Sequence, residues 1–379
     1  MTESAKRLLH ERAGARFTQL GDSKIVSSYG DVAAEYQALR HSAGVLDLSF
    51  RGRLCLTGKD RVRFLHGQVT NDVQKLKQGQ GCYAGLVNAK GKIESDLNIY
   101  ALNDELLLDF EPGLTPKLTE RFDKFIIADD VHVVDVSPHY GLVSVQGPQG
   151  EVVLRKADLG MEVPAEPFRF SSRNQENIGE IYCMKISRGP AIGFDLFFPI
   201  EACNAMTEKL VIAAKTIGGR LCGWDALEIG RIEAGLPRFG QDMDESNLAP
   251  ETGIEQRAIS YTKGCYIGQE VISRIRAYGQ VAKALRGLRL EGEPLPKRGD
   301  KIFHEAKEAG YITSAIHSPM LNMNIALGYV RREHNAMGTQ LVVSGYYATY
   351  PARAANAALA IMPSCGKSSA FLAEHKFSS

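Results

Sequence analysis

The chain has 379 residues, of which 44% are hydrophobic and 23% are charged, and its formal net charge is +1. A chain of this length is too long for one compact core, which favours two or three domains. The balanced charge provides no field that would attract nucleic acid or anionic lipid, and apolar runs such as Leu106–Phe110 are strand-sized, far short of a membrane span. We therefore expect a globular protein without a nucleic-acid or membrane partner.

The cysteines argue against disulfides and bound metal. There are seven of them, an odd number, and they are scattered without any C-x-x-C pair. This distribution is typical of a reducing compartment and predicts no structural zinc site. The polar segment at residues 1–17 lacks the apolar stretch of a secretory signal peptide. The expected location is therefore the cytoplasm.

The first three quarters of the chain predict helices and strands in irregular alternation. Asp31 precedes a helical repeat as a typical N-cap, and Thr115-Pro116 is typical of a helix start. Strand-like runs occupy residues 53–58, 82–88, 97–102 and 105–110. Together with later helices, these runs indicate an α+β core that extends to about residue 283.

The pattern changes at residue 284. Short strand-like runs are then separated by glycine, proline, asparagine and charged turn residues. This pattern predicts a small antiparallel barrel or sandwich over residues 284–351. The final residues, 352–379, are rich in alanine and serine without periodicity, and we expect them to form a mobile tail.

One segment gathers several reactive residue types around two glycines. It consists of Lys263, Gly264, Cys265, Tyr266, Ile267, Gly268, Gln269 and Glu270. The ammonium group of Lys263 could favour the thiolate form of Cys265. In the alternative interpretation, Cys265 is a buried residue of a glycine-rich turn and Lys263 points to water.

This segment resembles the K-G-C-Y-x-G-Q-E signature of the YgfZ family, a branch of the glycine-cleavage T-protein superfamily. Resemblance to the superfamily extends from about residue 29 to residue 350. It includes Asn71-Asp-Val, Gln146-Gly-Pro, Arg231-Ile-Glu-Ala-Gly and Gly240-Gln-Asp-Met-Asp-Glu. The resemblance implies a folate-binding α+β core of two intertwined subdomains, residues 1–283 split near residue 140, followed by a C-terminal antiparallel β-barrel.

The resemblance also implies contacts with folate. Glu233 matches the glutamate that holds the N–H donors of the pterin ring, and Tyr83 matches a ring that lines the folate channel. Asp195 resembles a second acidic position near the ligand, and Asp96 belongs to an acidic segment of the site. Arg257 is among the cations available to the anionic folate tail. Without the resemblance, Glu233 would be an ordinary helix carboxylate and Tyr83 a core residue.

One departure from the T-protein pattern bears on activity. T-proteins carry two adjacent acids in a G-x-x-x-D-D-L segment, and the first acid is implicated in activating folate. Here the segment begins at Gly91, and Ser95 replaces the first acid while Asp96 remains. Serine cannot act as a general acid or base near neutral pH. Glu94 would point to the other face of the strand, so the segment argues against aminomethyl transfer.

The resemblance to YgfZ proteins implies a tetrahydrofolate-binding accessory protein that supports assembly or repair of iron–sulfur clusters in client enzymes. A non-enzymatic role is favoured, with Cys265 as the reactive or docking group beside Lys263 and Tyr266. One thiol is too few to hold a cluster stably. The alternatives are a tetrahydrofolate-dependent aminomethyltransferase or demethylase of the T-protein type, and a binding module without folate. No long heptad repeat stands out, so we expect a monomer.

Overall fold

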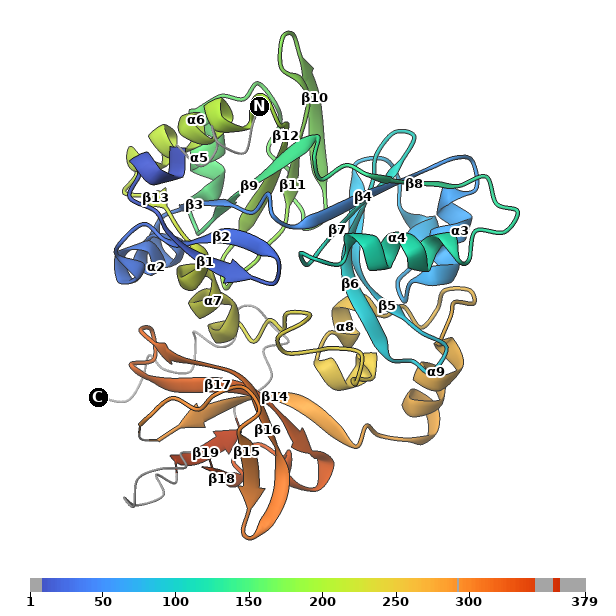
Figure 1. Cartoon of the computed structure of the whole chain (residues 1–379), viewed down its shortest axis with the longest axis vertical. Helices are drawn as coiled ribbons and strands as arrows, with labels where there is room; N and C mark the ends of the chain where they lie inside the picture. The colour runs from blue at the N-terminus through green and yellow to red at the C-terminus, as the bar shows by residue number, and fades with distance from the viewer. Residues whose placement is uncertain (1–8, 292, 345–356, 362–379) are drawn as a thin grey trace. The chain divides into compact units, whose positions relative to one another are not determined.

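The computed structural model describes residues 9–291, 293–344 and 357–361 (Figure 1). These residues form two compact units, each built from segments that are distant in sequence. The first unit holds the described residues up to 87 together with 94–230 and 258–267. The second unit holds 88–93, 231–257 and the described residues from 268 onward. Among the described residues, no helix combines the length and apolar character needed to cross a membrane.

The first unit contains a six-stranded sheet. In spatial order its strands are β10 (Phe170–Gln175), β11 (Gly179–Lys185), β12 (Gly193–Pro199), β9 (Tyr140–Gln146), β3 (Gly44–Asp47) and β13 (Arg220–Leu221). The pairs are antiparallel except β3–β13, which is parallel. Helices α5 (Gly150–Ala157) and α6 (Cys203–Lys215) lie against this sheet (Figure 1) and enclose one apolar core with it.

The first unit also contains a five-stranded sheet. In spatial order its strands are β5 (Gln80–Val87), β6 (Ile93–Ala101), β7 (Leu106–Phe110), β4 (Gly52–Thr57) and β8 (His132–Asp135). The first four coincide with strand-like runs of the sequence. Helices α3 (Arg61–Gln68) and α4 (Thr115–Asp123) pack on the sheet through Phe64, Leu65, Leu118 and Phe122, and η1 (Val73–Lys75) follows α3.

The chain passes alternately between the two sheets. Strand β3 belongs to the six-stranded sheet, β4 to β8 form the five-stranded sheet, and β9 to β13 return to the first. Arg53 lies where the chain crosses and is fully buried. Its Nη2 donates to the carbonyl oxygens of Ser49, Ser137 and Tyr140 at 3.2, 2.9 and 2.8 Å. This arrangement confirms the two intertwined subdomains predicted for the core.

The remaining elements of the first unit lie near the two ends of its sequence. Strands β1 (Arg16–Leu20) and β2 (Ser23–Ser28) form an antiparallel pair. Helix α2 (Val32–His41) begins after Asp31, whose side chain accepts a hydrogen bond from the Ala34 amide at 2.9 Å. The predicted N-cap is therefore confirmed. Helix α7 (Trp224–Glu233) begins in the first unit and ends in the second.

The second unit contains the predicted barrel. Its strands close in the order β14 (Lys283–Leu290), β17 (Met323–Arg331), β16 (Lys307–Ser318), β15 (Lys301–His304), β18 (Gln340–Ser344) and β19 (Ala357–Ile361). The interior is filled by apolar side chains such as Leu288, Ile302 and Ile312. Outside the barrel the unit adds η2 (Ala249–Thr252), α8 (Glu255–Ala258), α9 (Gln269–Tyr278) and η3 (Arg332–His334).

Strand β19 corrects one expectation. Residues 357–361 were expected in a mobile tail, but their backbone pairs with both β14 and β18 and closes the barrel. The alanine-rich segment has no alternating pattern of its own, so only its partner strands reveal it as a strand. The rest of the predicted tail, residues 352–356 and 362–379, lies outside the described residues.

Asp242, in the loop after α7, forms a buried ion pair with α7 and hydrogen bonds with the barrel within the second unit. Arg231 Nη1 lies 2.5 Å from Asp242 Oδ2. The other oxygen of Asp242 accepts hydrogen bonds from the hydroxyls of Thr313 and Ser314, each at 2.6 Å. The register of β16 shifts at this point. The acidic side chain therefore satisfies several donors at once where the strand is irregular.

Candidate functional site

Tyr83 on β5 and Asp96 on the neighbouring strand β6 meet on one face of the five-stranded sheet. The hydroxyl of Tyr83 donates to Asp96 Oδ2 at 2.8 Å. The second carboxylate oxygen, Oδ1, is buried and has no hydrogen-bond partner among the described residues. An unsatisfied buried oxygen of this kind costs roughly 1–3 kcal/mol. A ligand that presents an N–H donor would remove that cost.

The surroundings of Asp96 favour its protonated form. Burial raises the pKa of Asp96 to about 6, and the negative charge of Glu111 adds to the rise. The hydrogen bond from Tyr83 and the positive charge of Arg51 act in the opposite direction. A carboxyl group with a pKa close to neutrality can both give and accept a proton during a reaction. Asp96 is therefore suited to general acid–base chemistry.

Ser95 lies on the opposite face of β6 from Asp96. Its side chain is fully buried, as are those of Ile93 and Leu97, and its hydroxyl donates to the carbonyl oxygen of Asp96 at 3.1 Å. An acid at position 95 would be enclosed in the core at a high desolvation cost. The acid that lies beside Tyr83 is therefore at position 96, and Ser95 faces away from it.

Glu94 shares the face of Asp96, since residues two apart on a strand point the same way. The prediction that Glu94 and Ser95 point to opposite faces of the strand is thus confirmed. The Glu94 carboxylate accepts a hydrogen bond from Arg121 Nε at 2.9 Å. This ion pair gives Glu94 a partner of its own on α4.

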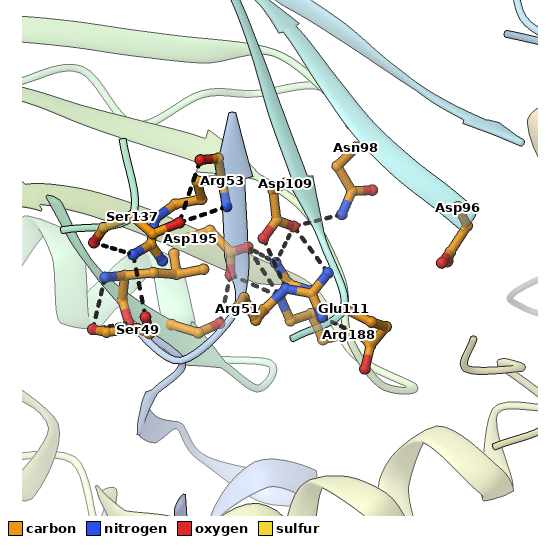
Figure 2. Close-up of polar contacts among 12 residues, drawn as sticks. Ser49, Arg51, Arg53, Asp96, Asn98, Asp109, Glu111, Ser137, Arg188 and Asp195 are labelled. Carbon is orange, nitrogen blue, oxygen red and sulfur yellow. Dashed lines mark hydrogen bonds and ion pairs between the residues drawn. The ribbon is translucent and has the colours of Figure 1, made fainter. Parts of the chain in front are cut away.

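A buried network of charges extends from the same sheet (Figure 2). Arg51, in the segment that crosses between the sheets, donates to Asp109 at 2.7 Å and also contacts Glu111. Asn98 donates to Asp109 at 2.8 Å, as does Arg188. Burial alone would raise the pKa of Asp109, but the charges of Arg51 and Arg188 outweigh it and hold that pKa well below its usual range.

Asp195 lies at the other end of this network, on β12. It is fully buried, and Arg188 Nε lies 3.2 and 2.9 Å from its two oxygens. Ser144 on β9 donates to Oδ1 at 2.7 Å. Both oxygens of Asp195 therefore already have donors within the chain.

The side chain of Lys263 turns inward. Lys263 is 7% exposed, and its Nζ donates to the carbonyl oxygens of His66 and Val69 at 2.5 and 2.6 Å. It also lies 4.7 Å from the ring centroid of Tyr266. Burial lowers the pKa of Lys263 to about 8. The alternative in which Lys263 points to water is wrong, because its ammonium group caps the carboxyl end of α3.

The rest of the Lys263–Glu270 segment is divided between the two units. Cys265 is exposed, so the buried alternative for this thiol is wrong. Gly268 has a φ of 82° and immediately precedes α9, which begins at Gln269. A residue with a side chain would be strained at that φ. Glu270 is exposed and pairs with Arg274 one turn later at 2.7 Å.

Two further predicted folate residues belong to the second unit. Glu233, at the end of α7, accepts a hydrogen bond from the hydroxyl of Ser318 on β16. Arg257 is exposed on α8. The structure thus joins Tyr83 directly to Asp96 and places Asp195 in the charge network of the same unit. The roles of Glu233 and Arg257 stay predictions.

Sequence reasoning missed the residues that connect this network: Arg51, Asp109, Glu111 and Arg188. A signal existed for two of them, since Asp109 and Glu111 alternate with apolar residues at the end of a strand-like run. No comparable pattern marks the arginines. Their burial depends on contacts between segments that are far apart in the chain.

Two intertwined sheets followed by a closed barrel constitute the T-protein fold. The profile of the GCVT N-terminal domain matches residues 8–263. The profile of the glycine cleavage T-protein C-terminal barrel domain matches residues 283–359. The chain therefore belongs to the glycine-cleavage T-protein family.

Individual relatives agree with this assignment. The aminomethyltransferase of Halalkalibacterium halodurans is 29% identical over 338 residues, which cover 88% of this chain and 91% of the relative. That of Geobacillus sp. WCH70 is also 29% identical, with 88% and 92% covered. The fold is shared with the glycine cleavage system aminomethyltransferase T from Bartonella henselae. That structure has a TM-score of 0.83 and 22% identity, with 94% of this chain and 96% of that chain covered.

Proposed function

We propose that this protein binds tetrahydrofolate and transfers a one-carbon unit from an amine to it, as an aminomethyltransferase or demethylase does. The observation that carries the proposal is the Tyr83–Asp96 pair, in which one buried carboxylate oxygen has no donor among the described residues. Membership of the T-protein family and the names of the relatives support the same reaction class. The burial of Ser95 removes the main sequence argument against it.

The geometry assigns separate tasks to the two residues. Tyr83 fixes the orientation of the carboxyl group by donating to Oδ2. Asp96 Oδ1 is then left to bind an N–H group of the substrate. Tetrahydrofolate supplies nucleophilic ring and side-chain nitrogens that carry such N–H groups. Because the pKa of Asp96 is about 6, its carboxyl group can move a proton at a substrate nitrogen near neutral pH.

The direct test is turnover. Purified protein is mixed with tetrahydrofolate and an aminomethylated lipoyl carrier protein, and methylenetetrahydrofolate is measured. We expect Asp96→Asn to lower kcat about 10²- to 10⁴-fold, the usual contribution of a general acid–base group. Ser95→Ala, a change on the opposite face of the strand, is the control and should retain activity. Absence of turnover in the wild-type protein, with tetrahydrofolate bound, would contradict the proposal.

A second candidate rests on Cys265. Among the described cysteines it is the exposed one, whereas Cys55, Cys183, Cys203 and Cys222 are buried. It lies in the Lys263–Glu270 segment that resembles the YgfZ signature. In this candidate the protein is a folate-binding accessory factor, and the thiol contacts a client or assembly protein of iron–sulfur clusters. Placement in the YgfZ branch stays a prediction that depends on this one segment.

Complementation separates the second candidate from the first. In a strain lacking the gene, Cys265→Ala should leave folate binding intact and abolish rescue of iron–sulfur enzyme activity. Ser273→Ala, at an exposed position on α9, is the matched surface control and should rescue fully. Full rescue by Cys265→Ala would eliminate the proposed role of the thiol.

A further inference from the structure

The strand register places Glu111 opposite Asp96. In the antiparallel ladder of β6 and β7, Asn98 pairs with Asp109. Two further steps along each strand lead to Asp96 on β6 and to Glu111 immediately after the end of β7, because antiparallel partners move in opposite directions. Residues two apart share a face. Asp96 and Glu111 therefore carry their side chains on the face that holds Asn98 and Asp109.

Arg51 holds Glu111 in this position. Glu111 is 8% exposed and contacts Arg51 Nη1. The Nε and Nη2 atoms of the same guanidinium donate to Asp109 at 2.7 and 3.2 Å. The guanidinium is planar, so its donors point in fixed directions. Asp109 thus fixes Arg51, and Arg51 prevents Glu111 from turning toward solvent.

The charged and titratable groups that act on Asp96 come from three elements. Tyr83 on β5 donates a hydrogen bond, Glu111 after β7 brings a negative charge, and Arg51 before β4 brings a positive charge. The Arg51 charge is shared between Glu111 and Asp109. Two carboxylates that face one another across a strand pair disfavour simultaneous ionisation.

We propose that Glu111 is a positioning residue for Asp96, whose anchored charge makes the Asp96 carboxyl group hold its proton to higher pH than burial alone would. Its chemical use rests on the proposed function. When the substrate C–N bond breaks, Asp96 gives this proton to the departing nitrogen, and when a folate nitrogen bonds to the one-carbon unit, Asp96 takes up the proton that this nitrogen loses. The carboxyl group thereby returns to its starting state after each turnover. The retention of the proton depends only on contacts within the chain.

The test follows the titration of Asp96 in the ligand-free, full-length protein by carbon-13 NMR of labelled aspartate carboxyl groups, with Asp96→Asn used for assignment. Glu111→Gln removes the charge while keeping the size of the side chain and an acceptor for Arg51. We expect the midpoint of Asp96 to fall by about one pH unit in this variant. Glu111→Asp keeps the charge and should retain most of the raised midpoint.

Glu94→Gln is the matched control. Glu94 lies on the same face of β6, two residues from Asp96, but its carboxylate pairs with Arg121. The midpoint of Asp96 should change little in this variant. An equal shift in Glu94→Gln, or no shift in folded Glu111→Gln, would overturn the inference. Should Glu111→Gln fail to fold, a wild-type midpoint near the ordinary value of about 4 would overturn it as well.

These outcomes are independent of the proposed function, because the titration uses no ligand. If the midpoint responds to Glu111 but the wild-type protein shows no one-carbon transfer, the positioning role stands and the proposed function fails. If transfer occurs but the midpoint does not respond, the positioning role fails and the proposed function stands. With both intact, the alkaline limb of the kcat profile, where the proton donor is lost, should move to lower pH in Glu111→Gln.

Discussion

Tyr83 and Asp96 are joined by a 2.8 Å hydrogen bond between neighbouring strands, and this bond leaves the second oxygen of Asp96 buried and without a donor among the described residues. The pair combines a fixed orientation with an open acceptor. In a folded protein such an acceptor is kept at a cost. A ligand that donates to it recovers that cost on binding, which is the physical basis of the proposed folate contact.

Removing the Tyr83 hydroxyl tests this orientation. In Tyr83→Phe the ring remains, but Asp96 loses the donor that lowers its pKa. We therefore expect the Asp96 midpoint to rise above about 6 and tetrahydrofolate to bind several-fold more weakly, because the carboxyl group is no longer held. Calorimetric titration with tetrahydrofolate measures the second effect. Tyr278→Phe, which alters an exposed tyrosine, is the control, and equal affinities in both variants would contradict the prediction.

The stability of the ligand-free protein should depend on pH through Asp96. Its pKa in the folded protein, about 6, lies above the ordinary value of 3.8, so ionisation is less favourable in the folded state. This group therefore contributes full stability below about pH 4, and that contribution is lost as pH rises through 6.

The variant Asp96→Asn removes this dependence. We compare the free energy of unfolding of the variant with that of the wild-type protein. We expect this difference to shift in favour of the variant by on the order of 2 kcal/mol as pH rises from 4 to 7. Urea unfolding at both pH values measures the difference. A difference between the two proteins that stays constant across this range would show that Asp96 does not have a raised pKa.

Lys263 should stabilise the fold through its two carbonyl partners. In Lys263→Met the carbonyl oxygens of His66 and Val69 lose their shared donor, and each buried acceptor left without a partner costs roughly 1–3 kcal/mol. We expect a loss of about 2 kcal/mol in the free energy of unfolding. Lys75→Met, at a lysine whose side chain is 74% exposed, should change it by less than about 0.5 kcal/mol. Similar losses in both variants would argue against the anchoring role.

Asp242 should be needed for the stability of the second unit. Asp242→Ala leaves Arg231 buried without its carboxylate partner, and breaking a buried ion pair from one side costs about 3–5 kcal/mol. Thermal unfolding measures this loss. Asp244→Ala is the control, because that carboxylate is 48% exposed and 3.8 Å from Arg298. A melting temperature for Asp242→Ala close to that of the control would contradict the assigned role.

Local sequence patterns were sufficient to predict part of this structure. The cap at Asp31, the strand positions and the opposite faces of Glu94 and Ser95 all follow from short-range chemistry and the two-residue period of a strand. The resemblance of the chain to T-proteins indicated the intertwined core and the barrel. It also indicated Tyr83 and Asp96, although nothing in the sequence showed that they are hydrogen-bonded.

Only the tertiary structure decided which residues act together. Whether Ser95 or Asp96 faces Tyr83 depends on which side of β6 packs on the apolar core, and that side is set by α3 and α4. The contact of Glu111 with Arg51, like the inward turn of Lys263, joins segments that are distant in the chain. The sequence by itself determined the family and the local elements. Long-range pairing determined the site, because burial and charge proximity are properties of the folded chain and not of its local pattern.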